Sequence, residues 1–191
     1  MIVLFSIKIK DINFGVSFSF FAVFGLMTLC GQTMTENIFT ALICCFLHEL
    51  GHLTLMFLFS DKPESIVLYG GGIRIVSGGR KMLSPDKDIA ILLAGCGANF
   101  LCAIVRLAFG GFDFFCIVNI LLGVFNLLPF KYFDGGRVLE ILLKGGRIYD
   151  LIRALFIFLW SVCVILMILN GSVSISFILT FCFVVISEIL Y

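Results

Sequence analysis

Long apolar stretches alternate with short polar connections along almost the whole chain. Each stretch contains about 17 to 24 residues, which is enough for an α-helix to cross about 30 Å of hydrocarbon. The pattern predicts an all-α polytopic membrane protein with about six transmembrane helices. They cover roughly residues 14–31, 37–59, 88–109, 112–130, 150–169 and 171–190.

Positive charges are concentrated in alternate connections between these stretches. Eleven Lys and Arg residues lie in the N-terminal segment, in residues 60–87 and in residues 131–149, which share one side if six helices alternate. The positive-inside rule therefore places both termini in the cytoplasm. The other two, Arg106 and Arg153, lie near helix ends, from which long side chains can reach the interface. The eleven residues are Lys8, Lys10, Lys62, Arg74, Arg80, Lys81, Lys87, Lys131, Arg137, Lys144 and Arg147.

Two segments have the pattern of β-strands instead. Residues 6–12 alternate polar and apolar positions, which predicts a short strand at the membrane interface. Residues 66–69 and 73–76 flank three glycines and predict a β-hairpin in a loop on the cytoplasmic side. An exposed strand there could bind an extended peptide through main-chain hydrogen bonds, with the glycine-rich residues 70–79 holding it. The hairpin could also simply rest on the membrane surface.

Composition supports a membrane protein and excludes some other classes. Of the 191 residues, 61% are hydrophobic and 13% are charged, about half the charged share of a soluble domain. The net charge of +1 gives no indication of a nucleic-acid partner. The eight cysteines lie in apolar runs without a C-x-x-C pair, so we expect buried thiols rather than disulfides or thiolate zinc ligands. The first apolar stretch is too long for a cleaved signal peptide.

The second predicted helix contains the pentapeptide His48-Glu49-Leu50-Gly51-His52, which includes both histidines of the chain. Histidines four residues apart share one face of a helix and can bind one metal ion, with Glu49 beside them. This arrangement is typical of zinc hydrolases, in which the carboxylate takes a proton from water at the metal. Ionisable residues within a membrane helix are costly and mark functional sites. The pattern predicts one catalytic Zn²⁺ in the cytoplasmic half of the bilayer.

A catalytic zinc of this kind needs a third protein ligand. Because no third histidine exists, we expect a carboxylate on the cytoplasmic side, and Asp134 in the segment 126–136 is the best candidate. Pro129 interrupts the helix, and the pair Gly135-Gly136 permits a sharp turn that could bring Asp134 back to the histidines. On these residues alone, Asp134 could also be the solvated residue of an ordinary helix-ending turn.

Two motifs together resemble the site-2 protease family of intramembrane zinc metalloproteases, peptidase family M50. They are HELGH on the second predicted helix and N-x-x-P-x-x-x-x-D-G on the fourth. Residues 94–99 stand where that family has A-G-P-x-x-N, with Cys96 in place of the proline. The resemblance covers about residues 5–140. The short six-helix plan is similar to the bacterial subgroup that includes the stage IV sporulation protein FB.

The resemblance implies one membrane-embedded metalloprotease domain over residues 1–191. Its catalytic core would cover about residues 37–140, and residues 141–191 would form two accessory transmembrane helices. It implies that the two histidines and Asp134 bind Zn²⁺ and that Glu49 is the general base. Asn126 and Asn99 match family asparagines and would contact the substrate or the oxyanion. Asn99 could instead bridge helices by hydrogen bonds.

The predicted function is therefore zinc-dependent intramembrane cleavage of a membrane-embedded or membrane-tethered protein. By analogy with the sporulation proteins, a pro-sigma factor or an anti-sigma factor is a candidate substrate. The expected setting is a bacterial cell membrane, with regulatory membrane proteins as further partners. One alternative is a zinc-binding transporter or an inactive membrane adaptor, neither of which needs Glu49 as a base. Another is a protease of the prenyl-protein type, with Glu140 as the third ligand.

Overall fold

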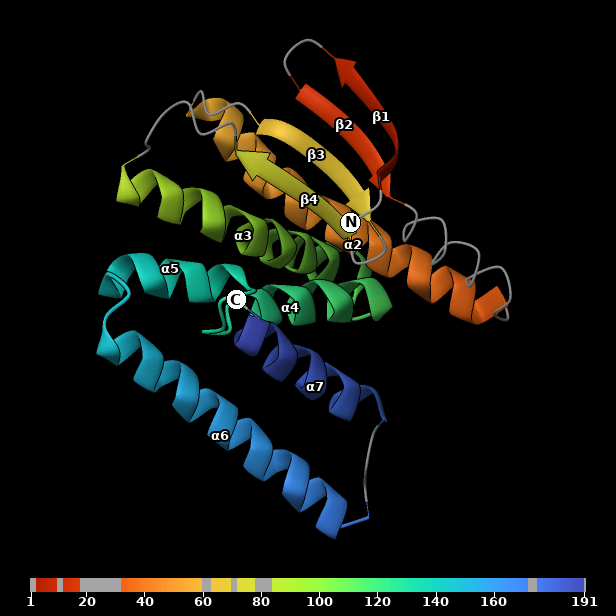
Figure 1. Ribbon diagram of the computed structural model, residues 1–191. Helices are drawn as coiled ribbons and strands as arrows, with labels where there is room; N and C mark the ends of the chain where they lie inside the picture. The colour runs from red at the N-terminus through yellow and green to blue at the C-terminus, as the bar shows by residue number, and fades with distance from the viewer. Residues whose placement is uncertain are drawn as a thin grey trace. The chain divides into compact units, whose positions relative to one another are not determined.

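The computed structural model describes residues 3–9, 12–17, 32–59, 63–69, 72–77, 84–171 and 175–190. The chain forms two compact units, residues 1–124 and 125–191, whose elements are drawn in Figure 1. The first unit contains a β-sheet and the helices that surround the histidine pair. The second contains the helices that follow residue 126.

A four-stranded sheet forms part of the first unit (Figure 1). β1 and β2 form an antiparallel hairpin, β3 and β4 form another, and β2 pairs with β3 in parallel. The strands are β1 (Val3–Ile9), β2 (Ile12–Ser17), β3 (Pro63–Tyr69) and β4 (Gly72–Ser77), in that order across the sheet. The predicted hairpin is confirmed, and the predicted N-terminal strand over residues 6–12 is confirmed up to Ile9, whereas Ile12 begins β2. Their union in a single sheet was not predicted.

The first predicted transmembrane helix, residues 14–31, is wrong at its start because these residues begin within β2. Val16 is paired with Phe5 on one side and with Leu68 on the other. Backbone pairing on both sides outweighs the apolar composition that suggested a helix. The remainder of that prediction, residues 18–31, lies outside the described residues, as do positions 70, 71, 78 and 79 of the glycine-rich segment.

Helices α2 (Gln32–Leu58) and α3 (Pro85–Gly110) pack side by side in the first unit. Gly51 permits this approach, because a Cβ at that position would lie 2.5 Å from the carbonyl oxygen of Ala94. Small residues commonly allow helix backbones to approach closely in membrane proteins. The glycine of the HELGH pentapeptide therefore has a packing role of its own.

Helix α4 (Phe114–Asn126) ends before the predicted boundary at residue 130. Pro129 lacks the N–H that a continuing helix would need, so residues 127–133 form a non-helical connection. The expected turn at Gly135-Gly136 is wrong, because both glycines lie in the first turn of α5 (Asp134–Leu143). Glycine is required there because the start of α5 lies directly against the backbone of the connection.

The second unit is completed by α6 (Arg147–Leu169) and α7 (Ile175–Leu190). Its packing centre is Phe130, which is fully buried in the connection that precedes α5. The ring of Phe130 lies 6.5 Å from that of Phe156 and 5.9 Å from that of Trp160, both on α6. These aromatic contacts attach the connection to α6.

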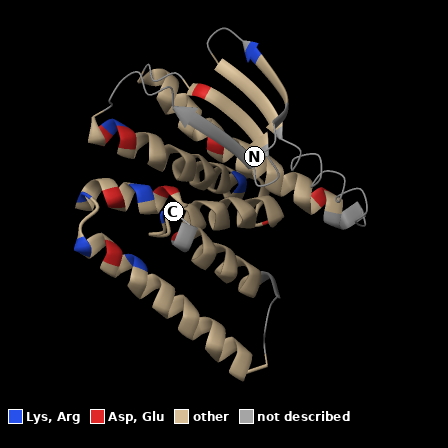
Figure 2. Ribbon diagram, viewed as in Figure 1, with Lys and Arg blue, Asp and Glu red and all other residues tan. Residues whose placement is uncertain are grey.

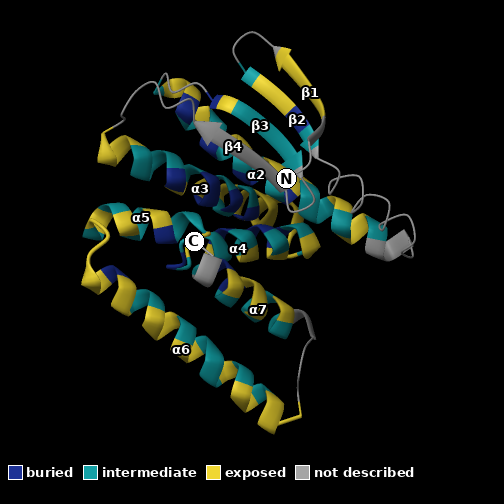
Figure 3. Ribbon diagram, in the orientation of Figure 1, coloured by how far each residue is buried: buried dark blue, intermediate teal, exposed yellow. Residues whose placement is uncertain are grey.

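Three segments of the described residues are long and apolar enough to cross a membrane: Thr35–Leu58, Pro85–Gly110 and Arg147–Leu169. The apolar helices Phe114–Asn126 and Phe177–Glu188 are shorter. Charged residues on α3 and α6 lie near the helix ends (Figure 2), and large apolar side chains are exposed along the helices (Figure 3). These features indicate a mostly helical membrane protein. The count of six membrane crossings stays a prediction.

Candidate metal centre

The histidine pair and Glu49 lie on α2, as the pentapeptide predicts. His48 and His52 are buried, with exposed fractions of 6% and 8%. Their Nε2 atoms lie 3.1 Å apart, and their ring planes are nearly perpendicular, at 84°. Two imidazole nitrogens thus converge inside the first unit.

Each histidine is oriented through its other ring nitrogen. Nδ1 of His48 lies 2.7 Å from Oδ1 of Asn99, and Nδ1 of His52 lies 2.7 Å from the carbonyl oxygen of Ile91. Both oxygens are acceptors, so each Nδ1–H donates, and each neutral ring turns an unprotonated Nε2 toward the other. Two such lone pairs repel unless a cation binds both. The donor set fits a divalent metal ion, since metal-binding histidines usually donate their other N–H to an oxygen.

Asn99, on α3, is fully buried and orients His48. Its Nδ2 donates to the carbonyl oxygen of Cys44 at 3.1 Å and to Oδ1 of Asn119 at 2.8 Å. Asn119, on α4, is also fully buried and donates in turn to the carbonyl oxygen of Phe115 at 2.9 Å. Both N–H bonds of Asn99 point to protein acceptors, which favours an orienting role over the predicted substrate contact. Sequence reasoning missed Asn119, although an amide inside an apolar helix is a usable signal.

The imidazoles fit against α3 only because residue 95 is glycine. A Cβ at Gly95 would lie 2.7 Å from Cε1 of His48 and closer still to the ring of His52. Ordinary carbon contacts are about 3.5 to 4.0 Å. By contrast, a Cβ at Gly97, on the same helix, would meet nothing within 4 Å. Gly95 therefore leaves the space that the two imidazoles of the candidate metal centre occupy, a role that the sequence did not suggest.

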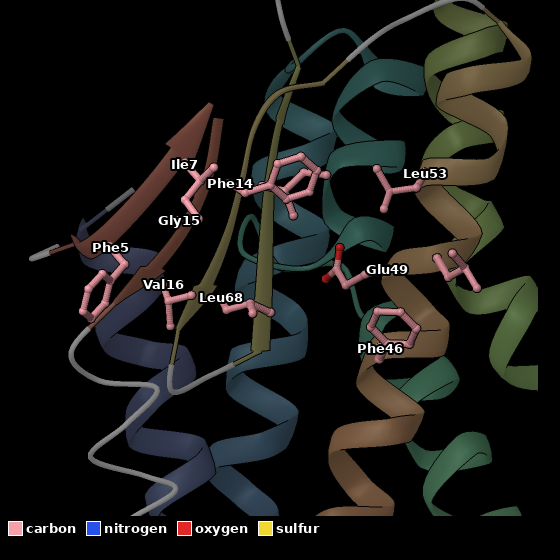
Figure 4. Close-up of a pocket in the computed structure, with 11 residues that line it drawn as sticks. Phe5, Ile7, Phe14, Gly15, Val16, Phe46, Glu49, Leu53 and Leu68 are labelled. Atoms are coloured by element: carbon pink, nitrogen blue, oxygen red, sulfur yellow. The ribbon is translucent and has the colours of Figure 1, made fainter. Parts of the chain in front are cut away.

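Glu49 lies beside the histidines and lines a pocket of about 300 Å³ between α2 and the sheet. Figure 4 shows its carboxylate directed into this space. Phe46, Leu50 and Leu53 share the same face of α2, at helical spacing. Apolar residues of β1, β2 and β3 form the opposite wall, and among the described residues that line the pocket Glu49 alone is charged. The carboxylate therefore faces an otherwise apolar space.

The other predicted site residues belong to the second unit. Asn126 is the last residue of α4, and Asp134 is the first residue of α5, after the connection 127–133. Glu140, the alternative third ligand, lies further along α5. The assignments of Asp134 to the metal and of Asn126 to the oxyanion stay predictions.

Two histidines on an apolar helix, oriented by hydrogen bonds and accompanied by a glutamate, define a zincin-type site in a membrane protein. Residues 111–170 match the sequence profile of peptidase family M50. The chain is 29% identical over 156 residues to the zinc metalloprotease MJ0392 of Methanocaldococcus jannaschii, covering 74% of this chain and 45% of that protein. Its fold is similar to that of the site-2 protease from Methanocaldococcus jannaschii, with a TM-score of 0.65 and 23% identity. That similarity covers 96% of this chain and 94% of the other.

These findings confirm the resemblance to the site-2 proteases: residues 111–170 match peptidase family M50, and the chain is similar in sequence to a zinc metalloprotease and in fold to a site-2 protease. It spans less than half the length of the curated relative that it matches. The narrower likeness to the sporulation subgroup stays a prediction.

Proposed function

We propose that this protein is a zinc-dependent intramembrane endopeptidase that cleaves membrane-embedded or membrane-tethered proteins. The observation that carries the proposal is the convergence of the two Nε2 atoms on α2, with each ring oriented by an oxygen beside its Nδ1. Glu49, the neighbouring residue on the same helix, supplies the carboxylate that hydrolysis requires. The kinship with family M50 supports the same assignment.

His48, His52 and Asp134 would hold the zinc ion. When bound, the ion would supply a Lewis acid that lowers the pKa of water to about 7. Asn99 and the carbonyl of Ile91 keep the two imidazoles in the tautomer that leaves Nε2 available. These outer contacts are part of the machinery, because they hold the ligands before the metal arrives.

Glu49 would accept the proton of the attacking water at its carboxylate and then donate it to the nitrogen of the leaving amine. The amide of Asn126 would donate a hydrogen bond to the oxygen of the scissile carbonyl as negative charge develops there. The apolar lining around Glu49 lowers the local dielectric constant, which strengthens the interactions of the carboxylate with a bound peptide.

The substrate would reach this site as an extended segment. A helical substrate hides its carbonyl groups in hydrogen bonds, so it must unwind locally before attack. The strands β1 and β4 are the two edges of the sheet, and an edge can pair with an unwound chain. The pocket beside Glu49 suits apolar side chains that flank the scissile bond, which are the side chains that a membrane segment carries.

The membrane topology follows from the distribution of charge. We place all eleven loop cations on the cytoplasmic side of a six-helix protein in a bacterial cell membrane, with both termini in the cytoplasm. Candidate substrates are membrane-tethered transcription regulators such as a pro-sigma or anti-sigma factor, and regulatory membrane proteins would control their access.

The test compares Glu49→Gln with the wild type in liposomes that contain a panel of tagged single-span membrane proteins. Glu36→Gln, an exposed glutamate on the same helix, is the matched control. We expect Glu49→Gln to keep its zinc and to lose cleavage by a factor on the order of 100 or more, while Glu36→Gln cleaves normally. Undiminished cleavage by Glu49→Gln would refute the general base. Zinc flux into the liposomes without cleavage by the wild type would favour the transporter instead.

A further inference from the structure

A buried ion pair in the second unit has no part in the chemistry described so far. Glu188, on α7, has a side chain only 4% exposed, and Arg153, on α6, has one 11% exposed. Their side chains pair directly. The expectation that Arg153 extends to the membrane interface is therefore wrong, because its guanidinium pairs with the buried carboxylate of Glu188. Buried charges in apolar segments are costly and call for a functional explanation.

The two oxygens of Glu188 serve different partners. Oε2 pairs with Arg153, and Oε1 accepts a hydrogen bond of 2.6 Å from the backbone N–H of Lys131. Lys131 lies in the connection 127–133, where the helical hydrogen-bond ladder is interrupted after Pro129. A carboxylate on α7 thus holds the middle of the connection that leads to Asp134.

Arg153 is itself fixed in place on α6. Its Nη1 donates to Oδ1 of Asp150 at 3.1 Å, and its guanidinium lies 5.0 Å from the ring centroid of the buried Tyr149. These contacts aim the guanidinium at Glu188. Because the carboxylate carries a charge, its hydrogen bond to the backbone is stronger than one between neutral groups.

The connection 127–133 packs tightly against the start of α5. A Cβ at Gly135 would lie 2.6 Å from Cα of Leu127, and a Cβ at Gly136 would lie 2.9 Å from the backbone nitrogen of Phe130. The first turn of α5 therefore rests on the backbone of the connection. Because Phe130 is also fully buried, a shift at Lys131 must move the first turn of α5 as well.

We infer that Glu188, supported by Arg153, is a positioning residue that sets where Asp134 stands in the second unit. This inference rests on the proposed function, in which Asp134 is the third zinc ligand. It gives α6 and α7 a role in holding Asp134, whereas the sequence suggested accessory helices. Outer contacts of this kind commonly change metal affinity by about 10- to 100-fold when they are removed.

The experiment uses the full chain in detergent and measures zinc affinity by competition with a chelator. The main variant is Arg153→Met combined with Glu188→Met, because removing both buried charges leaves neither unpaired. We expect about a tenfold or greater loss of zinc affinity, with thermal unfolding of the zinc-free protein close to that of the wild type. Hydrogen exchange in residues 127–133, followed by mass spectrometry, should become faster.

A second variant separates the hydrogen bond from the charge. Arg153→Met combined with Glu188→Gln keeps an amide oxygen that can accept from Lys131, so zinc affinity and slow exchange should recover. Arg147→Gln is the control, because Arg147 is an exposed charge at the start of the same helix. Its affinity should be unchanged.

The inference is overturned if the double methionine variant binds zinc as tightly as the wild type, or if the glutamine variant fails to recover affinity. Asp134→Ala, measured in parallel, tests the proposed function separately. Undiminished zinc affinity in Asp134→Ala would reject the ligand assignment itself. Loss of affinity in Asp134→Ala but not in the double methionine variant would reject only the role of Glu188.

Discussion

Replacing Gly95 by alanine should damage the metal centre without touching a ligand. The new Cβ would lie 2.7 Å from Cε1 of His48, whereas ordinary contact begins at 3.4 Å, so the ring must move by about 0.7 Å. The ring of His52 is displaced at the same time. Protein ligands hold a metal with distances defined to about 0.2 Å, so the shift exceeds what the site can absorb. We expect zinc affinity to fall on the order of 100-fold.

Gly97→Ala is the matched control for this prediction. Both glycines lie in α3, and alanine should favour the helix by up to about 1 kcal/mol in each case. Only at position 95 does the added methyl group meet the imidazoles. A difference between the two variants therefore reports the steric effect alone.

The assay is zinc competition with a chelator, combined with thermal unfolding of the zinc-free proteins. Gly97→Ala should match the wild type in affinity. In Gly95→Ala the displaced rings also lose their short bonds to Asn99 and to the carbonyl of Ile91, worth about 1 kcal/mol each. Equal zinc affinity in Gly95→Ala and Gly97→Ala would show that the rings do not occupy the space beside α3, and the reasoning would fail.

Three other outcomes are expected. Asn99→Ala should lower zinc affinity by about 10- to 100-fold and Asn119→Ala by less, since Asn119 acts through Asn99; equal effects in a titration would contradict this order. Leu53→Trp should fill the pocket and slow cleavage of substrates with large apolar side chains while zinc content stays normal; unchanged substrate preference would rule the pocket out. Arg106 pairs with Asp113 at 2.7 Å, so protonation of that carboxylate at low pH should remove the ion pair and its contribution to stability. Asp113→Asn should therefore reduce the fall of the unfolding temperature at low pH. An unchanged fall would show that other carboxyl groups cause it.

Local sequence patterns predicted the parts of the site that a single element determines. The spacing of His48 and His52 alone places both imidazoles on one face of α2, and the alternation on each side of the glycines is enough to define the β3–β4 hairpin. Pro129 correctly marked the end of a helix, because the loss of its N–H is a local effect.

Contacts between distant segments could not be predicted in the same way. The parallel pairing of β2 with β3 joins residues on either side of α2. The alternation of polar and apolar residues indicates a strand but does not indicate which strand it pairs with. Gly95 and Asn119 acquire their roles only when α3 and α4 pack against the histidine helix. Arg153 was assigned to the interface because its partner, Glu188, lies one helix further along the chain.

The parallel pairing of β2 with β3 has a consequence for shortened forms of this protein. A chain that begins after Ser17 would retain both imidazoles, Asn99 and Glu49, yet it would lack two of the four strands. Such a truncation would remove most of the wall that faces Glu49 across the pocket and uncover β3 as a new edge. Zinc binding and peptide hydrolysis should therefore be separable in this fold. We expect a truncated protein with full zinc occupancy to be inactive.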